Sequence, residues 1–216
     1  MTLINNIQNE FREIAPNSSV IPLQELLEYI ESELPKFVGS HTFDKIMVKK
    51  KNEIQHSAAF SAYMMKKQDR FTFMNEFPQR GSSKVDVAVI DKITDDIFFT
   101  IEAKVLPTPK DALRSEHEYV YGKGAGIQRF KEEFHGVDYQ DSPLSENGMI
   151  AYIKENDFEY WLSKVNQWIL DAQWNKSEQL EKIYFKSIAK LFSKHPRQSS
   201  SDVSLYHFWI YVHLKR

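Results

Sequence analysis

The sequence predicts a mixed α/β fold, because short apolar runs of strand length alternate with longer helical patterns. Apolar and aromatic residues alternate over the strand-like runs, and polar turns of hairpin length separate the first three of them. With 216 residues, 42% of them hydrophobic, the chain is long enough to bury the core of one domain. We therefore expect an αβββαβ core with a mixed central sheet flanked by helices. Its segments are a helix over 43–67, strands over 71–77, 84–90 and 97–105, a helix over 127–134 and a strand over 148–153.

Helical patterns flank this core on both sides. Residues 1–40 are expected to form an N-terminal helical extension packed on the core, with one helix that begins at Pro22 and ends at Pro35. The main domain covers 41–216, with its core over about 43–155 and C-terminal helices and a strand over 156–216. We place those helices after Asp157 and over about 177–192, and the final strand over 203–214.

Composition restricts the class of protein. The net charge of −2 gives no overall basic field for nucleic acid, so such a partner would need local clusters of Lys and Arg. Cys is absent, which leaves carboxylates, His and backbone oxygens as metal ligands and favours hard ions. The start of the chain lacks the pattern of a leader, and no apolar run is long enough to cross a bilayer. We expect a soluble, cytoplasmic protein.

Three charged residues interrupt the apolar strands between Lys84 and Val105, namely Asp86, Glu102 and Lys104. A buried carboxylate without compensation costs several kcal/mol or shifts its pKa. Glu102 and Lys104 share one face of their strand because the side-chain period is two. A cross-strand ion pair that only fixes the register is the structural alternative to a functional site.

An antiparallel pair of these strands would bring Asp86 and Glu102 together at one end of the sheet. Their carboxylates and the backbone carbonyl of Ala103 form half of an octahedral shell, which suits Mg²⁺, with Mn²⁺ as a substitute. Lys104 would then lie beside a metal-bound water, where it could orient that water or help to deprotonate it.

The elements Val85-Asp86 and Glu102-Ala103-Lys104 resemble the motif of the PD-(D/E)XK nuclease superfamily, which has the restriction-endonuclease-like fold. The expected order of helices and strands over 43–155 is similar to that of the family's core. Val85 stands where the motif's name places Pro, a position at which the family is permissive.

The resemblance implies a Mg²⁺-dependent endonuclease that hydrolyses phosphodiester bonds, with DNA as the main expectation and RNA as the alternative. It also implies supporting roles for Glu53, on the first core helix, and Gln128, on the helix after the third strand. A homodimer or a partner subunit would supply recognition, and bacterial restriction or anti-phage defence is the implied setting.

The sequence is compatible with alternative interpretations of the function and of two basic segments. A noncatalytic nucleic-acid-binding or protein-interaction module on the same fold is the alternative function. The glycine-rich stretch 122–126 leads into the helix that carries Gln128, and Lys123, Arg129 and Lys131 could bind a DNA phosphate there. A plain loop is the other interpretation of that stretch, and the basic cluster over 45–51 is either a solvated helix face or a backbone-contact patch.

Overall fold

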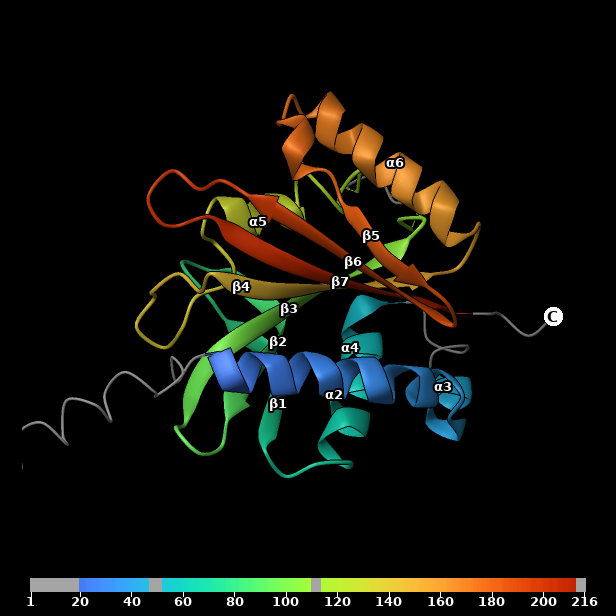
Figure 1. Cartoon of the computed structure of the whole chain (residues 1–216), viewed down its shortest axis with the longest axis vertical. Helices are drawn as coiled ribbons and strands as arrows, with labels where there is room; N and C mark the ends of the chain where they lie inside the picture. Colours follow the sequence, from blue (N-terminus) through green and yellow to red (C-terminus); the bar gives the residue numbers. More distant parts are fainter. Residues whose placement is uncertain (1–19, 47–51, 110–113, 213–216) are drawn as a thin grey trace, which may run out of the picture.

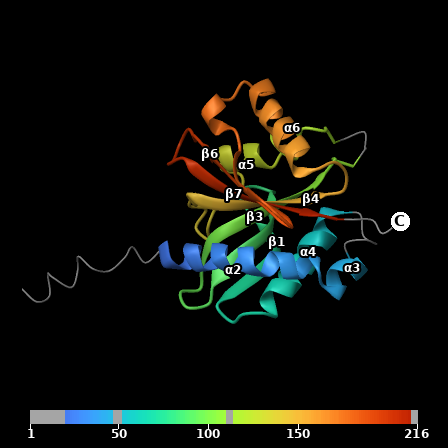
Figure 2. The ribbon, with the colours of Figure 1, turned by 45° about the vertical axis from the view of Figure 1, so that its right-hand side comes forward.

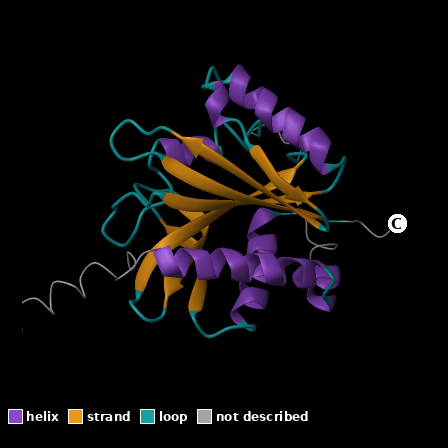
Figure 3. Cartoon of the chain, in the orientation of Figure 1, coloured by secondary structure: helices purple, strands orange, loops and turns teal. Residues whose placement is uncertain are grey.

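The computed structural model describes residues 20–46, 52–109 and 114–212, and they form a single mixed sheet of seven strands between two layers of helices (Figures 1 and 3). The strand order is β1-β2-β3-β4-β7-β6-β5. The strands are β1 Phe71–Pro78, β2 Lys84–Asp91, β3 Asp96–Leu106, β4 Glu146–Ile153, β5 Glu181–Phe185, β6 Ile188–His195 and β7 Val203–Tyr211. The helices are α2 Val20–Val38, α3 His41–Ile46, α4 Glu53–Met65, α5 Ile127–Lys131, α6 Phe158–Asp171 and the 3-10 helix η1 Lys176–Glu178. The predicted α/β class is confirmed.

Each face of the sheet has its own apolar core. On one face α2, α3 and α4 cover the inward side chains of β1 to β4, including Phe73, Phe99 and Ile150. On the other face α6 and α5 cover β4, β6 and β7, with Trp161 and Trp209 among the buried residues. Figure 2 shows the two helical layers on opposite sides of the strands. Alternating side chains of one strand thus enter different cores.

The centre of the sheet changes from antiparallel to parallel pairing at β3. Strands β1 and β2 pair antiparallel with their neighbours, whereas β3 with β4 and β4 with β7 are parallel. The register between β2 and β3 runs from Asp91 opposite Asp96 to Val87 opposite Ile101. Strand β3 continues to Leu106 and stays paired with β4 up to Ile153. Over its last residues β3 therefore has a partner on the β4 side, while its β2 side opens.

The prediction of one long helix over 43–67 is wrong. Two helices occupy that region, α3 and α4, and Asn52 is an extended N-cap whose side chain accepts from the backbone N–H of Gln55. Residues 47–51, with Lys49 and its two basic neighbours, lie outside the described part of the chain. Because α4 begins at Glu53, that residue sits in the first turn of a helix rather than in its middle.

Pro35 does not end the first helix, contrary to the prediction. Helix α2 continues to Val38, and Pro35 lies inside it. A proline within a helix removes one hydrogen bond and strains the preceding turn. Leu34 and Phe37, on either side of it, are fully buried in the core, and their burial offsets that cost. The expected segment 2–14 lies outside the described residues.

The C-terminal part was predicted wrongly as a helix over 177–192, and it forms strands β5 and β6 instead. These strands and β7 extend the same sheet through the parallel pair of β4 and β7. The aromatic and β-branched residues of β5, such as Ile183 and Tyr184, favour an extended chain. The helix expected over 127–134 is also shorter, since α5 ends at Lys131 and Glu133 has a positive φ of 60°.

A chain of buried hydrogen bonds begins in the core beneath α6. The Trp209 Nε1–H donates to the Tyr119 hydroxyl over 2.9 Å, and that hydroxyl lies 2.7 Å from Nδ1 of His207. Nε2 of His207 lies 2.8 Å from the Ser193 hydroxyl. Burial lowers the pKa of His207 well below its usual range, so the ring is neutral. A neutral ring accepts from Tyr119 at Nδ1 and donates to Ser193 at Nε2.

The same chain continues from Ser193 to the buried carboxylate of Glu178. The Ser193 hydroxyl donates to Nε2 of His195 over 2.8 Å, and Nδ1–H of His195 donates to Glu178 over 2.9 Å. Lys131 also donates to Glu178. Burial alone would raise the pKa of Glu178, but His195 and Lys131 lower it to about 2. Every proton in the chain then has an acceptor, with all donors pointing toward one carboxylate.

This network predicts acid sensitivity of the fold. Because His207 is held neutral when folded and titrates near its usual pKa when unfolded, the unfolded chain binds more protons below about pH 6.5. Stability should therefore fall as the pH drops from 7 to 5, by up to ~1.4 kcal/mol per pH unit for one histidine. Urea unfolding at several pH values measures this, and His207→Gln should flatten the profile. The exposed His41 provides the control, since His41→Gln should leave the slope as it is; an unchanged slope in His207→Gln would contradict the assignment.

Candidate active site

Two carboxylates occupy the edge of β3 that β2 leaves open. Oδ2 of Asp86 accepts from the backbone N–H of Ala103 over 2.7 Å, and Oε1 of Glu53 accepts from the N–H of Val105 over 3.0 Å. These N–H groups point to the same side of β3, because alternate residues of a strand share a hydrogen-bonding edge. The side chains of β2 and α4 thus take the place of a neighbouring strand.

Glu102 and Lys104 form the buried centre of the site on the face of the sheet that α5 covers. Their exposed fractions are 3% and 5%, and Lys104 Nζ donates to Oε1 of Glu102 over 2.7 Å. Two more nitrogen atoms lie near the Glu102 carboxylate: Nδ1 of His135 at 3.3 Å from Oε2 and Nη1 of Arg129 at 3.9 Å from Oε1. Among the described residues, Oε2 has no hydrogen-bond partner of good geometry.

The electrostatics of this pair keep both groups charged. Burial would raise the pKa of Glu102, but the Lys104 ammonium and His135 outweigh it and lower that pKa to about 2. Burial would likewise lower the pKa of Lys104, and the carboxylates of Glu102, Glu53 and Asp86 raise it above its usual value. Lys104 is therefore an ammonium at neutral pH, a hydrogen-bond donor and not a base.

Asp86 has the opposite electrostatic balance. Its burial and the nearby Glu102 carboxylate raise its pKa well above the usual range, and the opposing effects of Lys104 and the Ala103 N–H are smaller. The carboxyl group is thus the one acid of the site that the surrounding residues do not fully compensate. An additional positive charge beside this carboxyl would lower its pKa.

Arg114 holds Glu53 in place from the segment that precedes α5. Its Nη2 lies 2.8 Å from Oε1 of Glu53, and its Nε lies 2.8 Å from Oε1 of Glu118. Glu53 therefore links the open edge of β3, through Val105, to the segment that carries Arg114. The three side chains close the α4 end of the site.

The oxygen atoms at this edge suit a hard divalent ion. The carbonyl of Ala103 points to the same side as its N–H, toward Asp86, because both groups of one residue share an edge of a strand. With Asp86 and Oε2 of Glu102 it makes three oxygen ligands of the type that Mg²⁺ and Mn²⁺ take together with water. In the part of the chain that the structure describes, no three His, Asp or Glu side chains form a metal site on their own. An ion here would depend on the carbonyl, water and substrate as well.

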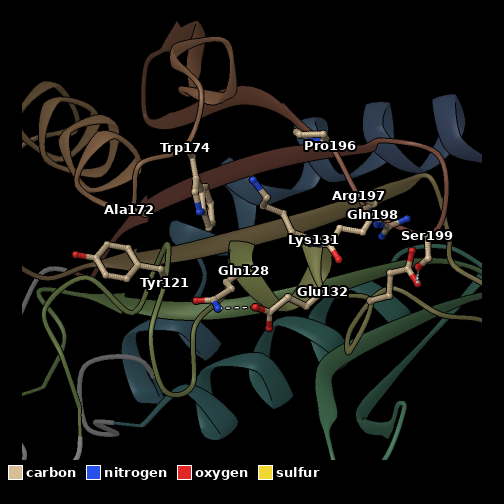
Figure 4. A pocket seen from close by; sticks show the side chains of 11 residues that line it. Tyr121, Gln128, Lys131, Glu132, Ala172, Trp174, Pro196, Arg197, Gln198 and Ser199 are labelled. Atoms are coloured by element: carbon tan, nitrogen blue, oxygen red, sulfur yellow. Dashed lines mark hydrogen bonds between the residues drawn. The ribbon is translucent and has the colours of Figure 1, made fainter.

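Of the other predicted site residues, only Arg129 lies beside the Glu102 carboxylate, whereas Gln128, Lys123 and Lys131 lie elsewhere. Arg129 reaches Glu102, whereas Gln128 and Lys131 line a separate cavity on the other side of α5 (Figure 4). The Gln128 amide donates to Glu132 over 2.6 Å and accepts from the N–H of Gly122 over 2.9 Å. Lys131 is bound to Glu178, and Lys123 is exposed on the loop before α5. With five residues, α5 is too short to act as a phosphate-binding helix terminus.

Two residues of the site had no signal in the sequence. His135 and Arg114 lie in irregular segments and reach Glu102 and Glu53 only through the fold. His135 is fully buried beside Phe130, with its ring edge against the phenyl ring at a centroid distance of 5.8 Å. A histidine after a short helix is typical of many loops, so its position alone does not indicate a carboxylate partner.

The chain matches no family model, no curated protein and no solved structure. None of the helices in the described part is both long and apolar enough for a membrane crossing.

Asp86→Asn should stabilise the metal-free protein at neutral pH. The pKa of the Asp86 carboxyl is raised in the folded state, whereas in the unfolded chain it is about 3.9. Above about pH 3.9 the unfolded chain releases this proton more readily than the folded protein does. The stability of the fold therefore falls as the pH rises above that value. The asparagine carries no charge and its Oδ1 still accepts from Ala103. Unfolding in EDTA at pH 7 should show a gain of about 1 kcal/mol, the scale reported for replacing incompletely compensated buried charges, and the gain should vanish near pH 3.5.

Asp91 at the other end of β2 is the matched control. It is a buried carboxyl as well, but the hydrogen bonds that Arg70 donates to it, at 2.9 and 3.1 Å, lower its pKa. The ionised Asp91 therefore adds to the free energy of unfolding at neutral pH, and this stabilisation is lost as the pH falls through the folded pKa of Asp91. Asp91→Asn should therefore cost about 2 kcal/mol at pH 7. Equal destabilisation by both substitutions would refute the assigned electrostatics.

Proposed function

We propose that the chain is a metal-dependent nuclease that hydrolyses phosphodiester bonds in DNA, with RNA as the alternative substrate. The observation that carries this proposal is the open edge of β3, where Asp86, Glu102 and the Ala103 carbonyl meet beside the Lys104 ammonium. The order of α4, β1 to β3, α5 and β4 also supports it, since it is the order expected of a restriction-endonuclease-like core.

Each residue has a role that follows from its chemistry. Asp86, Glu102 and the Ala103 carbonyl would hold Mg²⁺, or Mn²⁺ in its place, and the ion would supply a Lewis acid and an acidified water. Lys104 donates hydrogen bonds to the attacking water or to the phosphate oxygen on which charge develops. Glu53 fixes the edge of β3 through Val105. His135 and Arg129 orient the Glu102 carboxylate.

The net charge of the chain bears on how it would recognise nucleic acid. With a net charge of −2 the chain has little general attraction for nucleic acid, so a second copy or a partner subunit would supply recognition. An enzyme of this kind would act in the cytoplasm, in bacterial restriction or anti-phage defence.

A noncatalytic binding or interaction module is the second candidate, and one observation favours it. Glu102 already has Lys104, Arg129 and His135 around it, and that compensation needs no metal. In such a module the charged cluster would stabilise the fold, and Asp86→Asn would not change binding to nucleic acid or protein.

Metal-dependent cleavage separates the two functions. Duplex DNA, single-stranded DNA and RNA are incubated with the protein in Mg²⁺, in Mn²⁺ and in EDTA, and products are followed on gels. We expect cleavage that EDTA abolishes, and a rate at least ~100-fold lower in Asp86→Asn, Glu102→Gln and Lys104→Ala, as for the loss of other transition-state contacts. Asp86→Asn is the sharpest variant, because it should be more stable and yet inactive.

Lys84→Ala provides the matched control. Lys84 lies two residues from Asp86 on β2 but is exposed, with a side-chain exposed fraction of 56%. Its cleavage rate should stay within about threefold of the wild type, as for an exposed charge outside a site. No cleavage of any substrate by the wild type, or equal cleavage by all three site variants, would exclude the nuclease.

A further inference from the structure

A cavity of about 850 Å³ lies on the other side of α5 from the candidate active site. Gln128, Lys131 and Glu132 line it, while Arg129, between them in sequence, reaches Glu102. Residues near Trp174, after α6, and the loop between β6 and β7 form its other walls. In Figure 4, Trp174, Lys131 and Gln128 lie in the middle of the view, Tyr121 lies at its left, and Arg197, Gln198 and Ser199 lie at its right.

Two aromatic side chains give the cavity flat apolar surfaces. Trp174 projects into it from above in Figure 4, with Tyr121 on one side and Lys131 on the other. One face of Tyr121 stacks on His117, with centroids 4.0 Å apart and planes 15° apart. Lys131 Nζ lies 3.9 Å from the centroid of Trp174, which fixes the indole ring by a cation–π contact. The rings are thus held in place before any ligand binds.

The charges around the cavity do not favour an anion. Lys131 is neutralised by Glu178, and Nε and Nη1 of Arg197 donate to the backbone carbonyls of Phe130 and Leu144. Glu132 and Glu133 add two carboxylates to the lining. Nη2 of Arg197 is buried and has no hydrogen-bond partner among the described residues. A phosphate would therefore meet two carboxylates, a lysine that is already paired and an arginine that already donates two hydrogen bonds, which favours an uncharged ligand over a phosphate.

Uncharged polar groups remain for recognition. Gln128 and Gln198 carry amides, and Ser199 carries a hydroxyl that donates to Glu133. Amide side chains pair with the edges of nucleobases, and aromatic rings stack on their faces. Flat walls with donors and acceptors at the rim fit a planar, uncharged, polar ring.

From this arrangement we propose that the cavity binds a nucleobase with its sugar, stacked against Tyr121 and Trp174 and contacted at its edge by Gln128 or Gln198. The nucleoside unit comes either from an unstacked position of a nucleic-acid strand or from a free nucleoside or nucleotide. The first source rests on the proposed nuclease function, because α5 carries both Arg129, which reaches Glu102, and Gln128, which lines the cavity. Binding of a free nucleoside is independent of that function.

Calorimetry and anisotropy in EDTA test the proposal without cleavage. The probes are adenosine, cytidine, AMP and a labelled single-stranded DNA of 12 nucleotides, with inorganic phosphate as the charge control. We expect the nucleosides or the strand to bind, phosphate to fail, and Tyr121→Ala or Trp174→Ala to weaken binding about tenfold or more, as loss of one stacking platform does. Tyr121→Phe keeps the ring and should retain binding.

The matched control is Tyr160→Ala, an exposed tyrosine on α6 that is not part of the cavity lining. Binding of the strand alone identifies nucleic acid as the source, and binding of adenosine and AMP identifies a free ligand. Binding of phosphate with similar affinity, no binding of any probe, or equal loss in Tyr160→Ala overturns the proposal. Asp86→Asn separates it from the nuclease, since this variant should lose cleavage and keep nucleoside binding.

Discussion

The separation of β2 from β3 beyond the Val87 and Ile101 pair is the constraint on which the site depends. A buried strand edge must have its N–H groups satisfied, and here carboxylates do so in place of a strand. Negative charge is thereby drawn into the middle of a mixed sheet, where it needs cations nearby. Lys104 on the same strand is the first of these. Arg114 comes from the segment before α5, and Arg129 comes from α5 itself.

Nearby cations compensate the charge of Glu102 more fully than that of Asp86. Glu102 stays ionised because Lys104 and His135 stabilise its charge, whereas Asp86 has its pKa raised by burial and by Glu102 itself. Incomplete compensation of Asp86 lowers the stability of the fold, and in the proposed nuclease it would favour binding of a cation. Such a conflict between stability and function is common where groups are held for chemistry.

The sequence predicted the parts of the site that depend on local pattern. Charges in apolar strands identified Asp86, Glu102 and Lys104, and the alternation placed Glu102 and Lys104 on one face, as the structure has them. The helix over 177–192 was predicted wrongly, because the apolar spacing of this segment also fits a helix. The hydrogen-bonded pairing of β6 with β7, which local pattern does not reveal, makes the segment extended. The directions in which the side chains of Gln128 and Lys131 point depend on where the short α5 begins and ends. Local sequence pattern does not determine these bounds.

The segment before α5 links the candidate active site to the wall of the cavity beside Trp174. Glu118 binds Arg114, which binds Glu53 at the open edge of β3. The next residue, Tyr119, belongs to the buried chain of hydrogen bonds that runs from Trp209 to Glu178, to which Lys131 beside Trp174 also donates. Adjacent residues of one segment thus anchor the candidate active site and the cavity wall. Because Glu118 and Tyr119 are adjacent, buried and hydrogen-bonded, a displacement of these two residues would disturb the contact with Arg114 and the contact with His207 together.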